Sequence, residues 1–100
     1  MNDNRARVMT ACTLGDALRN CGDIAGSVDH LRTSADIAVE HSFTYFEARA
    51  QLGLARSLHL RGDDEPARLA AERARTIAHE RGYTLLAKAA EAAGEAAAAR

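Results

Sequence analysis

Apolar and small side chains recur at spacings of three and four residues along most of the chain, the pattern of helices that bury one face. In the first segment these positions are Val8, Ala11, Leu14, Gly15 and Leu18. The next three segments repeat the pattern, at Ile24, Val28, Leu31, Ala35 and Ala38, at Phe46, Ala50, Leu54 and Leu58, and at Ala67, Ala70, Ala71, Ala74, Ile77 and Ala78. Since no stretch shows the alternation typical of a strand, the pattern predicts an all-α fold with five helices over 4–21, 24–41, 44–61, 64–81 and 84–98.

Gly-Asp pairs mark two of the predicted turns. Gly22 and Gly62 stand where a helix ends in a left-handed residue, and Asp23 and Asp63 follow as N-caps of the next helix. The sequence Arg-Gly-Asp at 61–63 is therefore interpreted as a helix-to-helix turn and not as an adhesion motif.

Hydroxyl side chains precede the other two helices. Ser42 or Thr44 is predicted to cap the third helix, and Glu47, three residues after Thr44, would complete a capping box. Thr84 is predicted to open the fifth helix.

The chain repeats itself at an offset of 40 residues. The offset places Leu14 on Leu54, Leu18 on Leu58, Gly22-Asp23 on Gly62-Asp63, Ile37-Ala38 on Ile77-Ala78, Glu40 on Glu80 and Phe43 on Tyr83. Each unit holds two helices, so we predict one domain over 1–100 with a first repeat at 4–41, a second at 44–81 and a terminal helix at 84–98.

These repeats resemble the tetratricopeptide repeat family. The resemblance rests on Leu14-Gly15, Leu18, Gly22-Asp23, Ser27, Leu31 and Ser34 in the first copy, and on Leu54-Ala55, Leu58, Gly62-Asp63, Ala67, Ala71 and Ala74 in the second. The unit departs from the usual one of about 34 residues, because it is 40 residues long, lacks the early aromatic residue and lacks the closing proline. Such long units are similar to the helical-repeat regions of large actinobacterial transcription regulators and signalling ATPases.

The resemblance implies antiparallel helix pairs stacked into a right-handed solenoid, whose first helices line a groove that holds a peptide or another protein. It projects Met9, Cys12, Asp16, Arg19 and Asn20 from the first unit, and Arg49, Leu52, Arg56, His59 and Leu60 from the second, onto that groove. The family's clamp for a terminal carboxylate uses Lys and Asn at positions that here hold Cys12, Asp16, Leu52 and Arg56, so a chaperone-tail function is not expected.

Arg49 and Arg56 have two interpretations. Positions 49, 52, 56 and 59 advance by three, four and three, so they form one stripe along a helix. Either the arginines are ordinary solvated charges, with Arg56 paired to Asp16 of the neighbouring helix, or their guanidinium forks hold a carboxylate of a partner.

Composition argues against several other classes of protein. With 13 Lys and Arg against 14 Asp and Glu, the formal net charge is -1, which disfavours a nucleic-acid or anionic-membrane surface. No apolar run is long enough to span a membrane and the first residues do not form a secretory signal, so we expect a cytoplasmic protein.

Candidate chemistry is sparse. Cys12 and Cys21 lie on opposite faces of the predicted helix and are expected to be free thiols. The four histidines, His30, His41, His59 and His79, have no spacing that would hold a metal. No nucleophile with a base and no phosphate loop is seen, so we expect no enzyme activity, no cofactor and no metal.

The expected function is therefore a non-catalytic protein-interaction module of a bacterial regulatory system. The alternatives are a self-association module and, less favoured, a helical DNA-binding domain. Two repeats and one further helix are fewer than most arrays need, and Phe43, Tyr45, Phe46 and Tyr83 gather near the inter-repeat turns. We therefore expect a homodimer, or a neighbour in a longer parent protein, to complete the fold.

Overall fold

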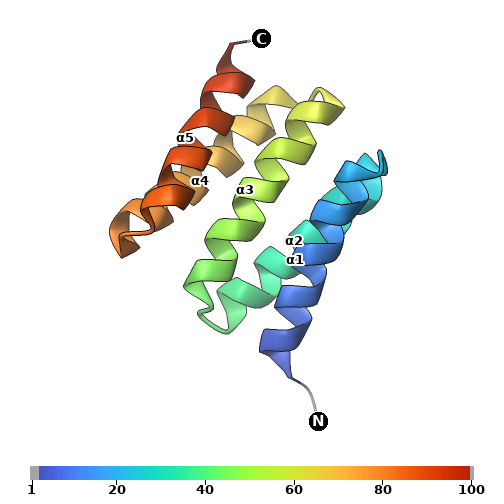
Figure 1. Ribbon diagram of the computed structural model, residues 1–100, viewed down its shortest axis with the longest axis vertical. Helices are drawn as coiled ribbons and strands as arrows, with labels where there is room; N and C mark the ends of the chain where they lie inside the picture. The colour runs from blue at the N-terminus through green and yellow to red at the C-terminus, as the bar shows by residue number, and fades with distance from the viewer. Residues whose placement is uncertain (1–2, 100) are drawn as a thin grey trace.

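The computed structural model describes residues 3–99, and all of their regular structure is helical (Figure 1). The helices are α1 (Asn4–Asn20), α2 (Ile24–Glu40), α3 (Thr44–Arg61), α4 (Asp64–Arg81) and α5 (Thr84–Ala98). The predicted all-α class is confirmed, and the predicted helices differ only in that α1 and α2 each end one residue earlier. Residues 1, 2 and 100 of the predicted domain lie outside the described part.

The helices form two layers. Figure 1 shows α1, α3 and α5 side by side, with α2 and α4 behind them. Each helix packs against the next one along the chain, and in addition α3 contacts both α1 and α5. The molecule measures 45 × 31 × 18 Å along its principal axes, so it is a thin slab with α3 at its centre.

Each of the four turns between helices contains a left-handed residue, and these residues are spaced 20 positions apart. Gly22, Gly62 and Gly82 have φ values of 90°, 90° and 74°, as expected for helix-ending glycines. The turn between α2 and α3 uses Ser42 at the equivalent place, with φ 58°. A left-handed conformation costs a residue with a Cβ about 1–2 kcal/mol, so this turn is more strained than the other three.

The predicted caps are only partly right. Asp23 caps α2, because its Oδ1 accepts a hydrogen bond from the Gly26 N–H at 2.9 Å. Asp63 occupies the N-cap position of α4 without a side-chain cap bond, and its carboxylate instead accepts a hydrogen bond from Arg61 Nε at 2.8 Å.

The capping box predicted for α3 is wrong. Phe43 is the N-cap residue, no side chain caps the helix, and Thr44 is already its first residue. The carboxylate of Glu47 does not reach back to the cap, since its Oε2 accepts two hydrogen bonds from Arg73 of α4, at 2.7 and 2.9 Å. Thr84 opens α5 as predicted, also without a side-chain cap.

The largest core cluster lies where α1, α2 and α3 meet and continues into α4. Leu31 and Val28 of α2 are fully buried beside Cys12 of α1 and Leu54 of α3. Leu31 fits because glycine faces it on α1: a Cβ on Gly15 would lie 2.5 Å from Leu31 Cγ. The absence of a side chain at this position thus lets α1 approach α2 closely.

Within residues 3–99, no helix has the length and apolar character needed to cross a membrane.

Candidate functional site

A groove with a volume of about 420 Å³ runs between α3 and α5. Its α3 side is formed by Ala55, Arg56, His59 and Leu60, its α5 side by Ala89, Ala92, Ala93 and Ala96, and Arg19 of α1 closes one end. We call this surface the α3–α5 groove. Its floor is apolar because alanines at spacings of three and four share one face of α5.

The α3 edge of the groove is cationic. Arg56 is exposed, and within residues 3–99 its guanidinium makes no ion pair or hydrogen bond. His59, one turn further along, has Nδ1 3.1 Å from Asp64 Oδ1. In the described part of the chain no Asp or Glu lines the groove, so Arg56 borders a surface formed mainly by alanines and Leu60.

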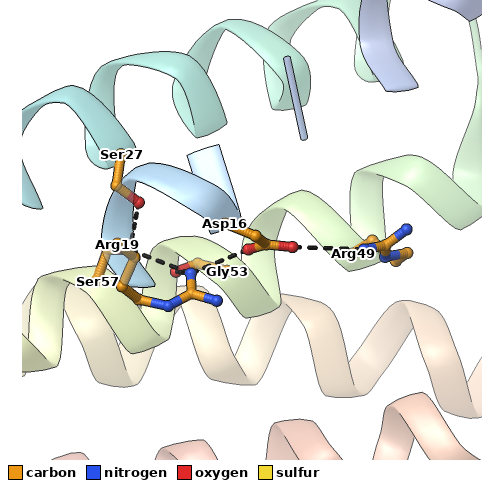
Figure 2. Close-up of polar contacts among 6 residues, drawn as sticks. All are labelled: Asp16, Arg19, Ser27, Arg49, Gly53 and Ser57. Atoms are coloured by element: carbon orange, nitrogen blue, oxygen red, sulfur yellow. Dashed lines mark hydrogen bonds and ion pairs between the residues drawn. The ribbon is translucent and has the colours of Figure 1, made fainter. Parts of the chain in front are cut away.

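Arg19 has a structural role at the end of the groove. Its side chain is only 11% exposed, and its Nη1 donates hydrogen bonds to the Gly53 carbonyl and to Ser57 Oγ, both at 3.3 Å. Ser57 Oγ in turn lies 2.7 Å from Ser27 Oγ (Figure 2). Arg19 therefore joins α1 to α3, and through Ser57 to α2, and is not free to bind a partner.

Asp16 is the acidic centre of this arrangement. Its Oδ1 lies 3.0 Å from Arg19 Nη1, and its Oδ2 lies 3.4 Å from Arg49 Nη2, as Figure 2 shows. The hypothesis that Asp16 pairs with Arg56 is therefore wrong, because Arg49 is the partner. Of the two candidate arginines, Arg49 is the ordinary ion-paired surface charge and Arg56 is the one available for binding.

The other projected residues do not reach the α3–α5 groove. Leu52 is 6% exposed and clusters with Ala74 of α4 and Ala90 of α5, so it belongs to the core. Asn20 is exposed at the last residue of α1 but does not line the groove. The candidate site is therefore reduced to Arg56, His59 and Leu60 of α3 together with the alanine face of α5.

Sequence reasoning missed the α5 side of the site. The signal was present, because Leu85, Ala89, Ala92 and Ala96 advance by four, three and four and so form one stripe of the helix. Leu85 is 84% exposed at the start of this stripe. Alanine-rich helices carry little contrast between faces, which is why this stripe was not singled out.

The two cysteines differ in burial. Cys12 and Cys21 are free thiols, the first buried and the second exposed. Burial raises the pKa of the Cys12 thiol, which keeps it protonated and unreactive at neutral pH. Among residues 3–99 there is no cluster of three His, Cys, Asp or Glu side chains placed to hold a metal ion.

Comparison with models of known protein families, with curated proteins and with solved structures gave no match.

Proposed function

We propose that this chain is a non-catalytic protein-interaction module of the tetratricopeptide type, which binds a peptide or protein segment in the α3–α5 groove. The layer formed by α1, α3 and α5 supports this proposal, since first helices of successive repeats line the binding face in that family. The observation that carries it is Arg56, an exposed and unpaired guanidinium beside an apolar floor.

The groove suits a segment that combines an apolar side chain with a carboxylate. Leu60 is 60% exposed and, with the alanines of α5, offers apolar surface that a partner side chain would remove from water. The fork of Arg56 suits a carboxylate, because two parallel N–H groups can bind both of its oxygens. From the family resemblance we propose that the module belongs to a bacterial regulatory system.

Selection from a random peptide library displayed on phage tests this function without knowledge of the native partner. We expect the immobilised chain to enrich peptides with an acidic residue next to apolar ones. Their dissociation constants, measured by fluorescence anisotropy, should rise at least about tenfold in Arg56→Glu, the effect of one lost charge-assisted contact plus repulsion. Ala92→Tyr should weaken the same peptides, because the ring fills the groove at an exposed position.

Arg32→Glu is the matched control, since Arg32 is an exposed arginine on α2 that does not line the groove. It should leave peptide affinity unchanged. Peptides that bind Arg56→Glu and Ala92→Tyr as tightly as the original chain would contradict the assignment of the groove.

Self-association is a second candidate function, favoured by Leu85. A leucine that is 84% exposed on the same α5 stripe as the groove alanines gives a second copy an apolar contact. Light scattering separates the two functions: a dimer that Leu85→Lys converts to a monomer would support self-association, whereas a monomer before and after the substitution would exclude it.

A further inference from the structure

A second pocket, of about 460 Å³, lies along the edge of the molecule where α1 begins and where the α2–α3 and α4–α5 turns are found, the lower-left edge in Figure 1. Its lining is formed by Arg5, Met9, Ser42, Phe43, Thr44, Tyr45, Phe46, Arg81 and Tyr83. We call it the aromatic pocket. It shares no residue with the α3–α5 groove, and it contains all four Phe and Tyr residues of the chain.

The rings of this pocket hold one another in place. Tyr45 packs edge-on against Phe46 and Tyr83, with centroids 5.4 and 5.3 Å apart and interplanar angles of 81° and 82°. Tyr45 nevertheless remains 43% exposed, so the pocket presents a fixed aromatic wall to its surroundings.

Two arginines border the rings without a carboxylate to neutralise them. Arg5 lies with Cζ 5.8 Å from the centroid of Phe43, a cation–π contact, and Arg81 extends from the last turn of α4. Both are exposed, and within residues 3–99 neither forms an ion pair. Among residues 3–99, no Asp or Glu lines the aromatic pocket, although the whole chain has a net charge of -1.

We propose that the aromatic pocket is a second binding site, which takes an acidic residue adjacent to an aromatic or long aliphatic side chain in a protein segment. The carboxylate is held by Arg5 and Arg81, and the apolar side chain packs against Tyr45, Tyr83 and Met9. Charge complementarity selects an anion, and the ring wall selects an apolar neighbour. This proposal stands on its own geometry and does not depend on the α3–α5 groove.

A protein segment fits this pocket better than a nucleotide does. Phe43 is already in contact with Arg5 and stacked on His41, with ring centroids 5.8 Å apart, and Tyr45 is engaged through edge contacts. Nucleic-acid sites offer open ring faces on which bases stack, together with a cationic groove that follows the phosphates. Among residues 3–99, only Arg5 and Arg81 supply cations to this pocket, too few for a groove that follows a phosphate backbone.

The test is a titration of the full ¹⁵N-labelled chain, followed by two-dimensional NMR, with the acetylated and amidated tripeptide Glu-Phe-Glu. We expect saturable shifts of the amides of Phe43, Tyr45, Phe46 and Tyr83. The uncharged tripeptide Gln-Phe-Gln should bind about tenfold more weakly, the effect of losing one charge-assisted contact. Equal dissociation constants for the two peptides would overturn the proposal, because the arginines would then make no contribution from binding a carboxylate.

Variants of the full chain assign the contacts. Arg81→Gln and Arg5→Gln should each weaken Glu-Phe-Glu severalfold, while Arg32→Gln should have no effect. In Arg56→Glu the shifts of Phe43, Tyr45 and Tyr83 should keep their dissociation constant, whereas any shifts of the groove alanines should weaken, so that the two sites are followed separately in one titration. Shifts confined to Ala89, Ala92 and Ala96, or uridine monophosphate binding the aromatic pocket more tightly than the peptide, would overturn the proposal.

Discussion

The junction between α1 and α3 and the junction between α3 and α5 occupy equivalent places in the repeat but are built differently. At the first, Leu31 of α2 inserts where Gly15 and Gly53 leave room, and Asp16 and Arg19 bind across to α3. At the second, α3 meets a face of α5 made almost entirely of alanine, and the α3–α5 groove stays open.

The 40-residue offset explains the difference residue by residue. The polar set of the first junction consists of Asp16, Arg19, Ser27, Arg49, Gly53 and Ser57, and its counterparts in the second are Arg56, His59, Ala67, Ala89, Ala93 and Ala97. Asp16 has Arg49 as its partner, whereas Arg56 faces Ala89 at the equivalent place. Within residues 3–99, Arg56 is therefore unpaired because Ala89 lies opposite it where the first junction has a charge of opposite sign, and this difference supports the proposal that the second junction is the binding surface.

The largest difference in the free energy of unfolding between variants of the two junctions should come from truncating a core leucine to alanine. Leu31→Ala should lower the free energy of unfolding by about 2–5 kcal/mol, because a fully buried leucine leaves a cavity among packed neighbours. Leu86→Ala, the matched change at the second junction, removes a partly exposed side chain and should cost clearly less. Urea unfolding of both variants measures this, and equal losses would contradict the idea of one filled and one open junction.

Smaller effects, of opposite sign, are expected from replacing a glycine by alanine on α1, where it faces α2, and on α5, where it faces α4. Gly15→Ala should lower the free energy of unfolding by about 1–2 kcal/mol, the cost of overpacking against Leu31 less the gain in helix propensity. Gly94→Ala of α5 should raise it by about 0.5–1 kcal/mol, since the new Cβ would lie at an ordinary 3.5 Å from Ala71 Cβ and alanine favours the helix. Thermal unfolding in which both variants move in the same direction would contradict the difference in packing.

Much of the fold was predictable from the sequence because its signals are local. The three- and four-residue spacing predicted the helices, and Gly22-Asp23 predicted both the left-handed residue and the cap that the structure contains. The first residue of α3 was predicted correctly but its capping box was not, because the buried carboxylate of Glu47 binds the tertiary partner Arg73 in preference to a cap. No local rule carries that information.

The candidate site was less predictable because it depends on how the helices cross. Arg49 and Arg56 lie on one stripe of α3, and the spacing alone does not say which of them meets Asp16. Which arginine pairs with Asp16 depends on how far along α3 the contact with α1 lies. Leu52 lies on the same stripe but is covered by α4 and α5. The spacing therefore could not predict that Arg56 is exposed and Leu52 is buried.

The smallest effect distinguishes the two arginines by stability alone. Arg49→Glu brings a carboxylate toward Asp16 in place of the ion pair, and it should lower the free energy of unfolding by about 0.5–1 kcal/mol at low salt, since exposed pairs contribute little. Arg56→Glu should change it by less than about 0.5 kcal/mol, because no pair is broken. Urea unfolding at low ionic strength and in about 1 M salt tests this. At about 1 M the Debye length is about 3 Å, so salt should reduce the loss of stability in Arg49→Glu and leave the stability change of Arg56→Glu unaltered. If Arg56→Glu is instead the more costly and more salt-sensitive change, Arg56 is the partner of Asp16, and a loss of peptide binding in that variant no longer identifies the groove.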